Sequence, residues 1–257
     1  MTEFSPTSTA STAYLDRVAA TRAARTYKHG LLKSLCIGPG ARVLDVGCGP
    51  ATDLAALAEE VGPSGRVFGV DRDPAMVVTA RARIEAYGNV EVHEADAHQL
   101  PFEAASIDRA RVDRVLMHVA DPSAVLAELH RVLRGGGLLA LAEPDWDTLA
   151  IDHPDLAISR GFTRYIAERA NRNQAIGRRL PRLAADAGFT VRAVGNPAAV
   201  ITDFEVGETI LGLRRNTDRA VAAGYLTREQ GRAWLGHLTG GGTFFATVST
   251  ITVNASV

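Results

Sequence analysis

The sequence predicts a doubly wound α/β fold whose mostly parallel sheet carries helices on both faces. Short apolar runs alternate with helix-like stretches, and this alternation is typical of parallel strands joined by right-handed crossovers. The chain has 257 residues, 46% of them hydrophobic and 22% charged, which is enough for one large core. The predicted strands are 42–46, 66–70, 90–92, 109–112 and 138–142, and the predicted helices between them are 52–61, 74–87 and 122–134.

The pattern loosens after Glu143. Helices are expected at 155–172 and 178–187, a strand near 190–202, and helical pieces over 205–237. The last run, TFFATVSTITVNASV, is rich in β-branched and aromatic residues and predicts a long strand that joins the sheet. The sheet would then have seven strands. Before Gly38-Pro39-Gly40, one or two N-terminal helices are expected.

Composition narrows the function classes. The net charge is −1 with both signs interleaved, so neither nucleic acid nor an anionic membrane is an expected partner. The only lysines, Lys28 and Lys33, lie in a polar N-terminal segment, which disfavours Schiff-base chemistry. Cys36 and Cys48 are too few for a disulfide framework or a zinc site, so no metal is expected and a reducing cytoplasm fits. No signal peptide or apolar run of membrane-spanning length appears, so membrane insertion is not expected.

The segment VLDVGCGPATD follows the first predicted strand and contains Gly47 and Gly49. In an open α/β sheet the ligand lies beyond the carboxyl ends of the strands, and glycine lets the backbone turn there and a ligand approach it. Asp71 ends the next strand, 22 residues after Gly49, close to the spacing at which a carboxylate accepts hydrogen bonds from ribose hydroxyls. A nucleoside derivative is therefore the expected ligand.

Two details separate this turn from a dinucleotide site. Thr52 stands where the third glycine of the dinucleotide fingerprint would be, and Pro50 removes an N–H that a pyrophosphate would use. Asp45, at the strand end, would repel phosphates and suit a cationic amino group. S-adenosylmethionine has an ammonium, a sulfonium and no phosphate.

Over about residues 27–145 the chain resembles the class I S-adenosylmethionine-dependent methyltransferases, especially the small-molecule branch that includes ubiquinone and menaquinone C-methyltransferases. The segments that carry the resemblance come in the family's order: VLDVGCGPATD, VFGVDRDPAMV, EADAHQLPF, RVDRVLMHVADP and LHRVLRGGGLLALAEPD. It implies a Rossmann-like methyltransferase fold in one domain, 1–257, with an N-terminal helical lid (1–36), a cofactor-binding core (37–145) and a C-terminal part (146–257) that completes the sheet and the acceptor pocket.

The resemblance also implies the cofactor contacts. Asp45, Gly47 and Gly49 would surround the methionine moiety, and Asp71 would take the ribose hydroxyls. The remaining residues would serve adenine and the reactive methyl: Arg72 and Met76 packed against the ring, Asp96 accepting its amino group, the Ala97 N–H at a ring nitrogen, and Val112 or Asp113 facing the methyl. Ala51 departs from the family, where many relatives have another glycine.

Catalysis does not require a general base, since alignment and exclusion of water can supply much of the rate in an in-line displacement. His118 and Asp145 are the candidate catalytic residues, with Glu143 and His153 as further bases near the strand ends. His118 could equally be a hydrogen-bonded structural histidine. Trp146 and Tyr14 are candidates for the acceptor pocket, and simple packing is the alternative for both.

The leading hypothesis is a methyltransferase that uses S-adenosylmethionine, forms S-adenosylhomocysteine, and acts at oxygen or carbon of a small apolar or aromatic molecule in quinone or secondary metabolism. The alternatives are a protein that keeps the cofactor without transferring methyl, such as a cyclase or a binding protein, and an NAD-linked reductase. The expected partner is a small-molecule acceptor, and the chain would be a monomer or a homodimer.

Overall fold

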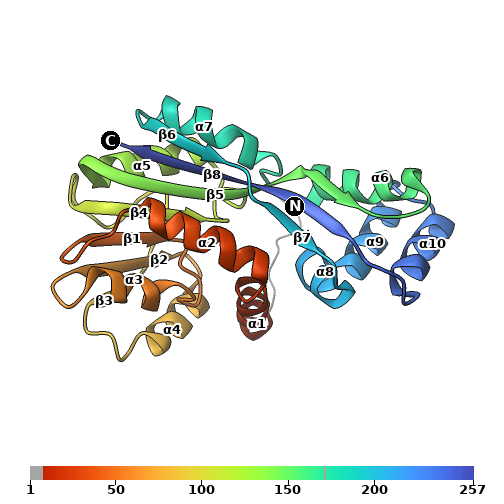
Figure 1. Cartoon of the computed structure of the whole chain (residues 1–257), viewed down its shortest axis with the longest axis horizontal. Coiled ribbons are helices and arrows are strands. Elements are labelled where there is room, and N and C mark those ends of the chain that lie inside the picture. Colours follow the sequence, from red (N-terminus) through yellow and green to blue (C-terminus); the bar gives the residue numbers. More distant parts are fainter. Residues whose placement is uncertain (1–7, 171) are drawn as a thin grey trace.

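The computed structural model describes residues 8–170 and 172–257. Its sheet has eight strands in the order β3-β2-β1-β4-β5-β8-β6, with β7 pairing β8 (Figure 1). Strands β1 to β5 run parallel, and β8 lies antiparallel to β5, β6 and β7. The strands are β1 (Arg42–Val46), β2 (Arg66–Asp71), β3 (Val90–Glu94), β4 (Ile107–Asp113), β5 (Leu133–Ile151), β6 (Thr190–Gly195), β7 (Ala198–Ile201) and β8 (Ala246–Ser256).

The helices fall into an N-terminal pair, the helices between strands, and a C-terminal group. Each of the three helices predicted between the first five strands is found, and one of its ends differs from the predicted one by a few residues. The helices are α1 (Ser8–Ala19), α2 (Arg22–Ser34), α3 (Leu54–Val61), α4 (Pro74–Arg83), α5 (Pro122–Val132), α6 (Leu156–Tyr165), the π-helix η1 (Ile166–Ala170), α7 (Ile176–Asp186), α8 (Phe204–Leu211), α9 (Leu213–Ala222) and α10 (Arg228–Thr239).

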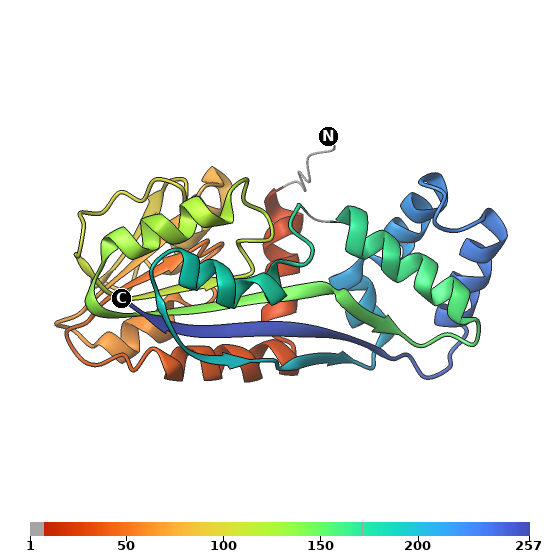
Figure 2. The same ribbon diagram turned by 90° about the horizontal axis from the view of Figure 1, so that it is seen from above.

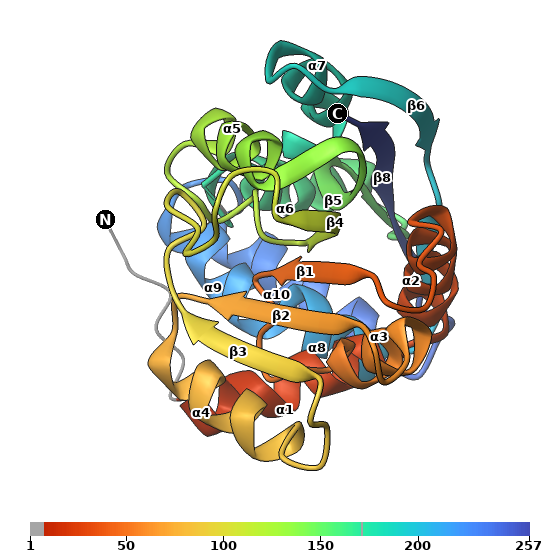
Figure 3. The same ribbon diagram turned by 90° about the vertical axis from the view of Figure 1, so that its left-hand side faces the viewer.

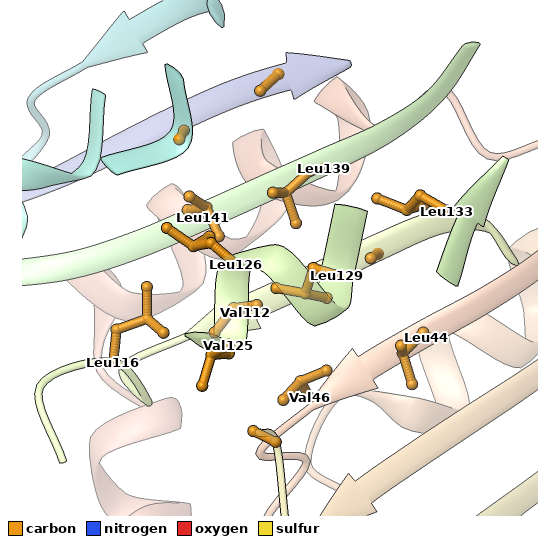
Figure 4. Packing of buried hydrophobic residues seen from close by; sticks show 14 of the residues in the cluster. Leu44, Val46, Val112, Leu116, Val125, Leu126, Leu129, Leu133, Leu139 and Leu141 are labelled. Atoms are coloured by element: carbon orange, nitrogen blue, oxygen red, sulfur yellow. The ribbon is translucent and has the colours of Figure 1, made fainter. Parts of the chain in front are cut away.

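Alternating side chains of the strands build a core on each face of the sheet, because successive residues of a strand point to opposite faces. On β1, Val43 packs with α3 and α4, whereas Leu44 and Val46 pack with α5 and α7. Figure 4 shows the second of these cores, in which α5 lies across β4 and β5. Figure 3 shows α5 and α7 on one side of the sheet and α2 and α3 on the other. The predicted doubly wound fold is confirmed.

The predicted strand 190–202 is two strands, so the sheet has eight strands where seven were expected. Gly195 ends β6 and Ala198 begins β7, with Pro197 between them. Proline has no N–H to give to a ladder, so pairing stops there, although the Pro197 carbonyl still accepts a bond of 3.0 Å from the Thr250 N–H.

Strand β5 is far longer than the predicted 138–142 because β8 pairs with it as far as Ile151, past an irregularity between Asp145 and Ala150. The extended ends of β5, β7 and β8 carry a second hydrophobic cluster with α6, η1, α8, α9 and α10, which we call the helical lobe. Figure 2 shows these helices gathered at the far end of the long strands, away from α3 and α5. In the described part of the chain, no helix is both long and apolar enough to cross a bilayer.

Candidate cofactor and active site

The turn after β1 is built from three left-handed residues: Gly47 (φ +71°), Gly49 (φ +52°) and Ala51 (φ +66°). It folds back on β2, because the Gly47 and Cys48 N–H groups donate to the Val70 carbonyl at 2.7 and 3.0 Å. Glycine adopts this conformation without strain, whereas alanine does not. Ala51 therefore holds a backbone conformation that glycine would adopt without strain.

The lack of a side chain on Gly47 and Gly49 lets neighbouring protein side chains pack against the turn. A Cβ on Gly47 would lie 2.2 Å from Cγ2 of Val115, which belongs to the loop after β4. A Cβ on Gly49 would meet Leu15 Cδ1 of α1 at 3.5 Å. In addition to the tight turn and the ligand approach expected from the sequence, the two glycines thus also leave room for protein side chains.

Asp71 is tied directly to the glycine turn. Its Oδ2 accepts from the Gly49 N–H at 2.9 Å, and its Oδ1 accepts from the Asp73 N–H at 2.9 Å. Burial raises the pKa of Asp71, and these two hydrogen bonds oppose the rise. Helix α4 is capped by Asp73, whose side chain accepts from the Ala75 N–H, so Asp71 does not cap it. Each carboxylate oxygen can accept a second bond, so the carboxylate can still receive hydroxyls.

Asp45 does not face a ligand space alone, as the sequence suggested, because it lies in a buried ionic network. Both of its oxygens are 3.3 Å from Nη1 of Arg111, the residue beside it on β4. Nη2 of the same guanidinium donates to Asp53 at 2.8 Å and to Asp113 at 2.7 Å. Arg111 is only 1% exposed and binds three carboxylates: Asp45 on β1, Asp113 at the end of β4, and Asp53 at the start of α3.

Helix α2 completes this network. Lys28 Nζ lies 2.5 Å from Asp53 and 3.5 Å from Asp113, and the Tyr27 hydroxyl donates to Asp113 at 3.0 Å. Lys28 is buried, although the sequence placed it in a polar segment. Sequence reasoning also missed Arg111 and Asp53. The available signal was an arginine between Ala110 and Val112 in a central strand, since a buried arginine requires partners.

Burial and charge together set the pKa values of the carboxyl groups within the network. Burial raises the pKa of Asp45 to about 6, against the opposing effect of Arg111. Burial would also raise the pKa of Asp53, but Arg111 and Lys28 outweigh it and lower the value to about 2. Asp53 is therefore ionised at neutral pH, and Asp45 is the group of the pair that takes up a proton as the pH falls towards 6.

The loop after β4 is held by Glu143 of β5. Glu143 Oε1 accepts from the N–H groups of Val115 at 2.7 Å and Leu116 at 2.6 Å, while Oε2 has only a 3.4 Å contact with the Met117 N–H. The carboxyl group is fully buried, which raises the pKa of Glu143 to about 8. Glu143 therefore clamps the loop and is not free to act as a general base.

This clamp predicts a pH-dependent stability. The folded-state pKa of Glu143 lies above its usual 4.5, so its stabilising contribution is complete below pH 4.5 and is lost as the pH rises through 8. In this window the loss amounts to about 1.4 kcal/mol per pH unit. Glu143→Gln keeps the accepting oxygen, so its free energy of unfolding should change less between pH 6 and pH 8 than that of the wild type. Urea unfolding at both pH values measures this.

Glu128→Gln is the control, because Arg131 lowers the pKa of Glu128 and its titration lies below this window. That variant should keep the wild-type difference in stability between pH 6 and pH 8. An equal pH dependence in wild type and Glu143→Gln would show that Glu143 is already ionised at pH 6.

The two candidate catalytic residues lie in different surroundings. His118 is an exposed residue, yet the protein around its imidazole, followed by the charges of Arg72 and Arg114, lowers its pKa to about 4. Asp145 is 1% exposed, and both of its oxygens bind the guanidinium of Arg178 on α7. Asp145 thus positions α7 against β5, and its carboxylate is not available as a base.

The two residues expected to face the reactive methyl, Val112 and Asp113, also lie in different surroundings. The Val112 side chain is fully buried in the core against α5, so it cannot face a ligand, whereas Asp113 belongs to the ionic network. Arg114 follows with φ +59°, a strained conformation for a large side chain. His153 is buried in the helical lobe with its ring centre 5.4 Å from that of Trp234, so it serves packing there.

Helix α1 joins the cofactor-side residues to the helical lobe. Thr12 Oγ1 donates to the sulfur of Met76 at 3.9 Å, and Asp16 forms two hydrogen bonds with Arg83 of α4. Tyr14 is half-buried on this helix, and α1 also contacts α8. Leu15 of this helix stands against Gly49 of the glycine turn, and the role of the N-terminal segment as a lid stays a prediction.

The candidate adenine and acceptor residues occupy the same end of the sheet. Arg72 is exposed after β2, Met76 is buried at 4%, Asp96 is exposed after β3, and Ala97 is buried beside it. Trp146 follows the core part of β5 and packs against both the sheet core and the helical lobe.

A family model described as a methyltransferase domain matches residues 37–185, more than half of the chain. The chain belongs to the methyltransferase family. This confirms the family, fold and cofactor class that the sequence predicted: an S-adenosylmethionine-dependent methyltransferase.

Three known proteins show how far the likeness of this methyltransferase extends. An uncharacterized 37.1 kDa protein in a transposon of Streptomyces fradiae is 52% identical over 242 residues, which are 94% of this chain and 70% of that protein. A demethylmenaquinone methyltransferase of Geobacillus kaustophilus is 36% identical over 125 residues, 48% of this chain and 53% of its own length. The chain spans about half the length of the demethylmenaquinone methyltransferases it matches.

The third protein is similar in structure. The geranyl diphosphate C-methyltransferase from Streptomyces coelicolor, solved with Mg²⁺, geranyl diphosphate and S-adenosylhomocysteine, superposes with a TM-score of 0.56 at 16% identity. The match covers 93% of this chain and 83% of that one. At this identity the likeness shows a common fold.

Proposed function

We propose that this methyltransferase transfers a methyl group from S-adenosylmethionine to a small apolar or aromatic molecule, at oxygen or carbon. The observation that carries the proposal is the hydrogen bond between Asp71 and the Gly49 N–H, which makes the ribose-binding carboxylate and the glycine turn one unit at the ends of β1 and β2. Trp146 lies on β5 of the same sheet and packs against both the sheet core and the helical lobe.

The residues present fit the cofactor. Asp71 would hold the ribose hydroxyls, and Arg72 and Met76 would pack against adenine. Asp96 would accept a hydrogen bond from the adenine amino group, and the Ala97 N–H would donate to a ring nitrogen. Pro50 and the buried carboxylates of the ionic network make the turn unsuited to a diphosphate. When bound, S-adenosylmethionine supplies an electrophilic methyl on its sulfonium.

The ionic network suits the amino acid end of this cofactor. It presents carboxylates, Asp45 and Asp113, together with the cations Lys28 and Arg111. An amino acid carries an ammonium and a carboxylate, so both of its charged groups find opposite charges there. The acidic groups would attract the ammonium and sulfonium, and the third N–H of Lys28, beyond its contacts with Asp53 and Asp113, would hold the carboxylate.

An apolar acceptor is supported by the aromatic side chains of Trp146 and Tyr14, which are half-buried and would contact it. Trp146 also packs against the apolar core of the helical lobe. The relatives named for demethylmenaquinone and geranyl diphosphate act on molecules with large apolar parts. Loops and added segments commonly select the ligand in such folds, so the helical lobe would choose the acceptor here.

We assign no general base. A base with a pKa of about 4, as His118 has, is poorly matched to removing a proton at neutral pH. Asp145 and Glu143 are engaged with Arg178 and with backbone N–H groups. The protein would accelerate transfer by aligning the acceptor with the methyl and by excluding water under α1.

Incubation with methyl-labelled S-adenosylmethionine and a panel of quinols, phenols and isoprenoids tests the proposal. The expected result is a labelled product together with an equal amount of S-adenosylhomocysteine for at least one acceptor. Tight cofactor binding without turnover across the panel would instead favour a cyclase or a binding protein.

Asp71→Asn tests the ribose assignment. The asparagine NH₂ would face the backbone N–H of either Gly49 or Asp73, both of which now donate to the carboxylate. The substitution also removes the negative charge offered to the ribose hydroxyls. The affinity for S-adenosylhomocysteine, measured by calorimetry, should fall about 5- to 150-fold, as expected for 1 to 3 kcal/mol. Asp73→Asn is the neighbouring control and should retain the affinity, because an asparagine also caps a helix. Unchanged affinity in Asp71→Asn would refute the assignment.

A further inference from the structure

His98 lies between the candidate adenine-binding carboxylate and helix α5. Its Nδ1 is 2.5 Å from Oδ1 of Asp96, and its own backbone N–H donates to the same oxygen at 2.9 Å. Both bonds use Oδ1. Within residues 8–170 and 172–257, no protein group donates to Oδ2 of Asp96, and the Asp96 side chain is 61% exposed. His98 thus fixes one oxygen of the carboxylate and leaves the other open.

The hydrogen bond at the opposite edge of the imidazole indicates the tautomer of the neutral ring. The Asp121 backbone N–H donates to Nε2 of His98 at 3.2 Å. Because an N–H needs an acceptor, Nε2 is unprotonated, and the proton of the neutral ring is on Nδ1, where it donates to Asp96. Asp121 in turn caps α5 by accepting from Ser123 and Ala124. The Asp96 carboxylate is therefore connected through His98 to a helix terminus.

A second set of bonds holds the remainder of the same loop. The Leu100 N–H donates to Glu128 of α5 at 2.9 Å, and Arg131 of α5 donates to the Phe102 and Leu100 carbonyls. These bonds fix the far end of the loop, but none reaches Asp96. The backbone and side-chain bonds from His98 lower the pKa of Asp96, so this carboxylate is an ionised acceptor at neutral pH.

We infer that His98 is a positioning residue that gives the methyltransferase its preference for adenine over hypoxanthine. By holding Oδ1, it turns Oδ2 towards the exocyclic amino group of the cofactor. A carbonyl oxygen in place of that amino group would face the carboxylate and be repelled. This inference rests on the proposed function, in which Asp96 receives the adenine amino group.

Two substitutions separate the two contacts of the ring. In His98→Asn the amide nitrogen replaces Nδ1 and can still donate to Asp96, but nothing replaces Nε2. In His98→Gln the amide oxygen replaces Nε2 and can still accept from Asp121, but the side-chain donor to Asp96 is lost and only the backbone N–H of residue 98 still donates to Oδ1. Each protein is titrated calorimetrically with S-adenosylhomocysteine and with S-inosylhomocysteine, which has a carbonyl in place of the amino group, and thermal melts check that the variants fold.

The wild type should prefer the adenosyl ligand, His98→Asn should keep that preference, and His98→Gln should reduce the ratio of the two affinities by about tenfold. If His98 had only a structural role, His98→Gln would weaken the binding of both ligands equally and leave the ratio of the two affinities unchanged. That result would overturn the inference. A wild type that binds neither ligand would refute the proposed function itself. A wild type that binds both equally would refute the role of Asp96 and His98 while leaving cofactor binding intact.

Discussion

Replacing Gly47 with alanine should destabilise the protein by about 2 to 5 kcal/mol and weaken cofactor binding at least tenfold. Two costs add: the new Cβ would stand 2.2 Å from Val115 Cγ2, which is worth about 1 to 3 kcal/mol as overpacking, and φ +71° costs an L-residue about 1 to 2 kcal/mol. Val115 cannot easily move away, because its side chain is β-branched and its N–H is bound by Glu143. Urea unfolding and calorimetry with S-adenosylhomocysteine measure the two effects.

Gly136 provides a matched control. It has nearly the same backbone, φ +75°, but a Cβ there would have nothing within 4 Å. Gly136→Ala should therefore cost only the backbone part, about 1 to 2 kcal/mol, and should leave cofactor binding intact.

The double variant Gly47→Ala with Val115→Ala isolates the steric part. Removing the valine methyls makes room for the new Cβ, so the double variant should be more stable than the sum of the single effects by about 1 to 3 kcal/mol. Strict additivity would show that Val115 does not determine the requirement for glycine at position 47.

Replacing Arg111 with methionine should destabilise the fold by about 3 to 5 kcal/mol, the usual cost of removing one partner from a buried ion pair. The guanidinium binds Asp45, Asp53 and Asp113, and Lys28 reaches only two of these three carboxylates. Asp45 would then lose the cation that binds both of its oxygens. Urea unfolding at pH 7 measures the loss.

Two further proteins make this result interpretable. Arg182→Met removes an exposed pair within α7 and should change the stability by no more than about 0.5 kcal/mol. Adding Asp45→Asn to Arg111→Met removes the carboxylate left unpaired, so part of the lost stability should return. If Arg111→Met alone cost less than about 1 kcal/mol, the network would not be a buried, mutually compensating group of charges.

Local patterns predicted the core strands because each was a short segment containing β-branched or other apolar residues between turn residues. The far end of β5 could not be predicted, since residues 146–151 form a strand only through pairing with β8, about 100 positions later. The division of the strand at 190–202 was predictable in principle from Pro197, which cannot donate to a ladder.

The glycine turn and Asp71 could be predicted from the sequence, whereas the ionic network could not. Gly47 and Gly49 come just after β1 and Asp71 ends β2, and the fold class alone places strand ends together. The ionic network was missed because its members come from α2, β1, the start of α3 and β4; Tyr27 and Asp113 are 86 positions apart. The sequence likewise offered Asp145 as a possible base because Arg178, which occupies its oxygens, lies 33 positions later on another helix.

The central claim is that the glycine turn and Asp71 bind an adenosyl amino acid, and calorimetric titration of the purified chain tests it most directly. S-adenosylmethionine and S-adenosylhomocysteine should each bind at one site per chain, NADH should give no binding heat, and Asp71→Asn should weaken the two adenosyl ligands. Saturable binding of NADH, together with no heat from either adenosyl ligand, would contradict the account.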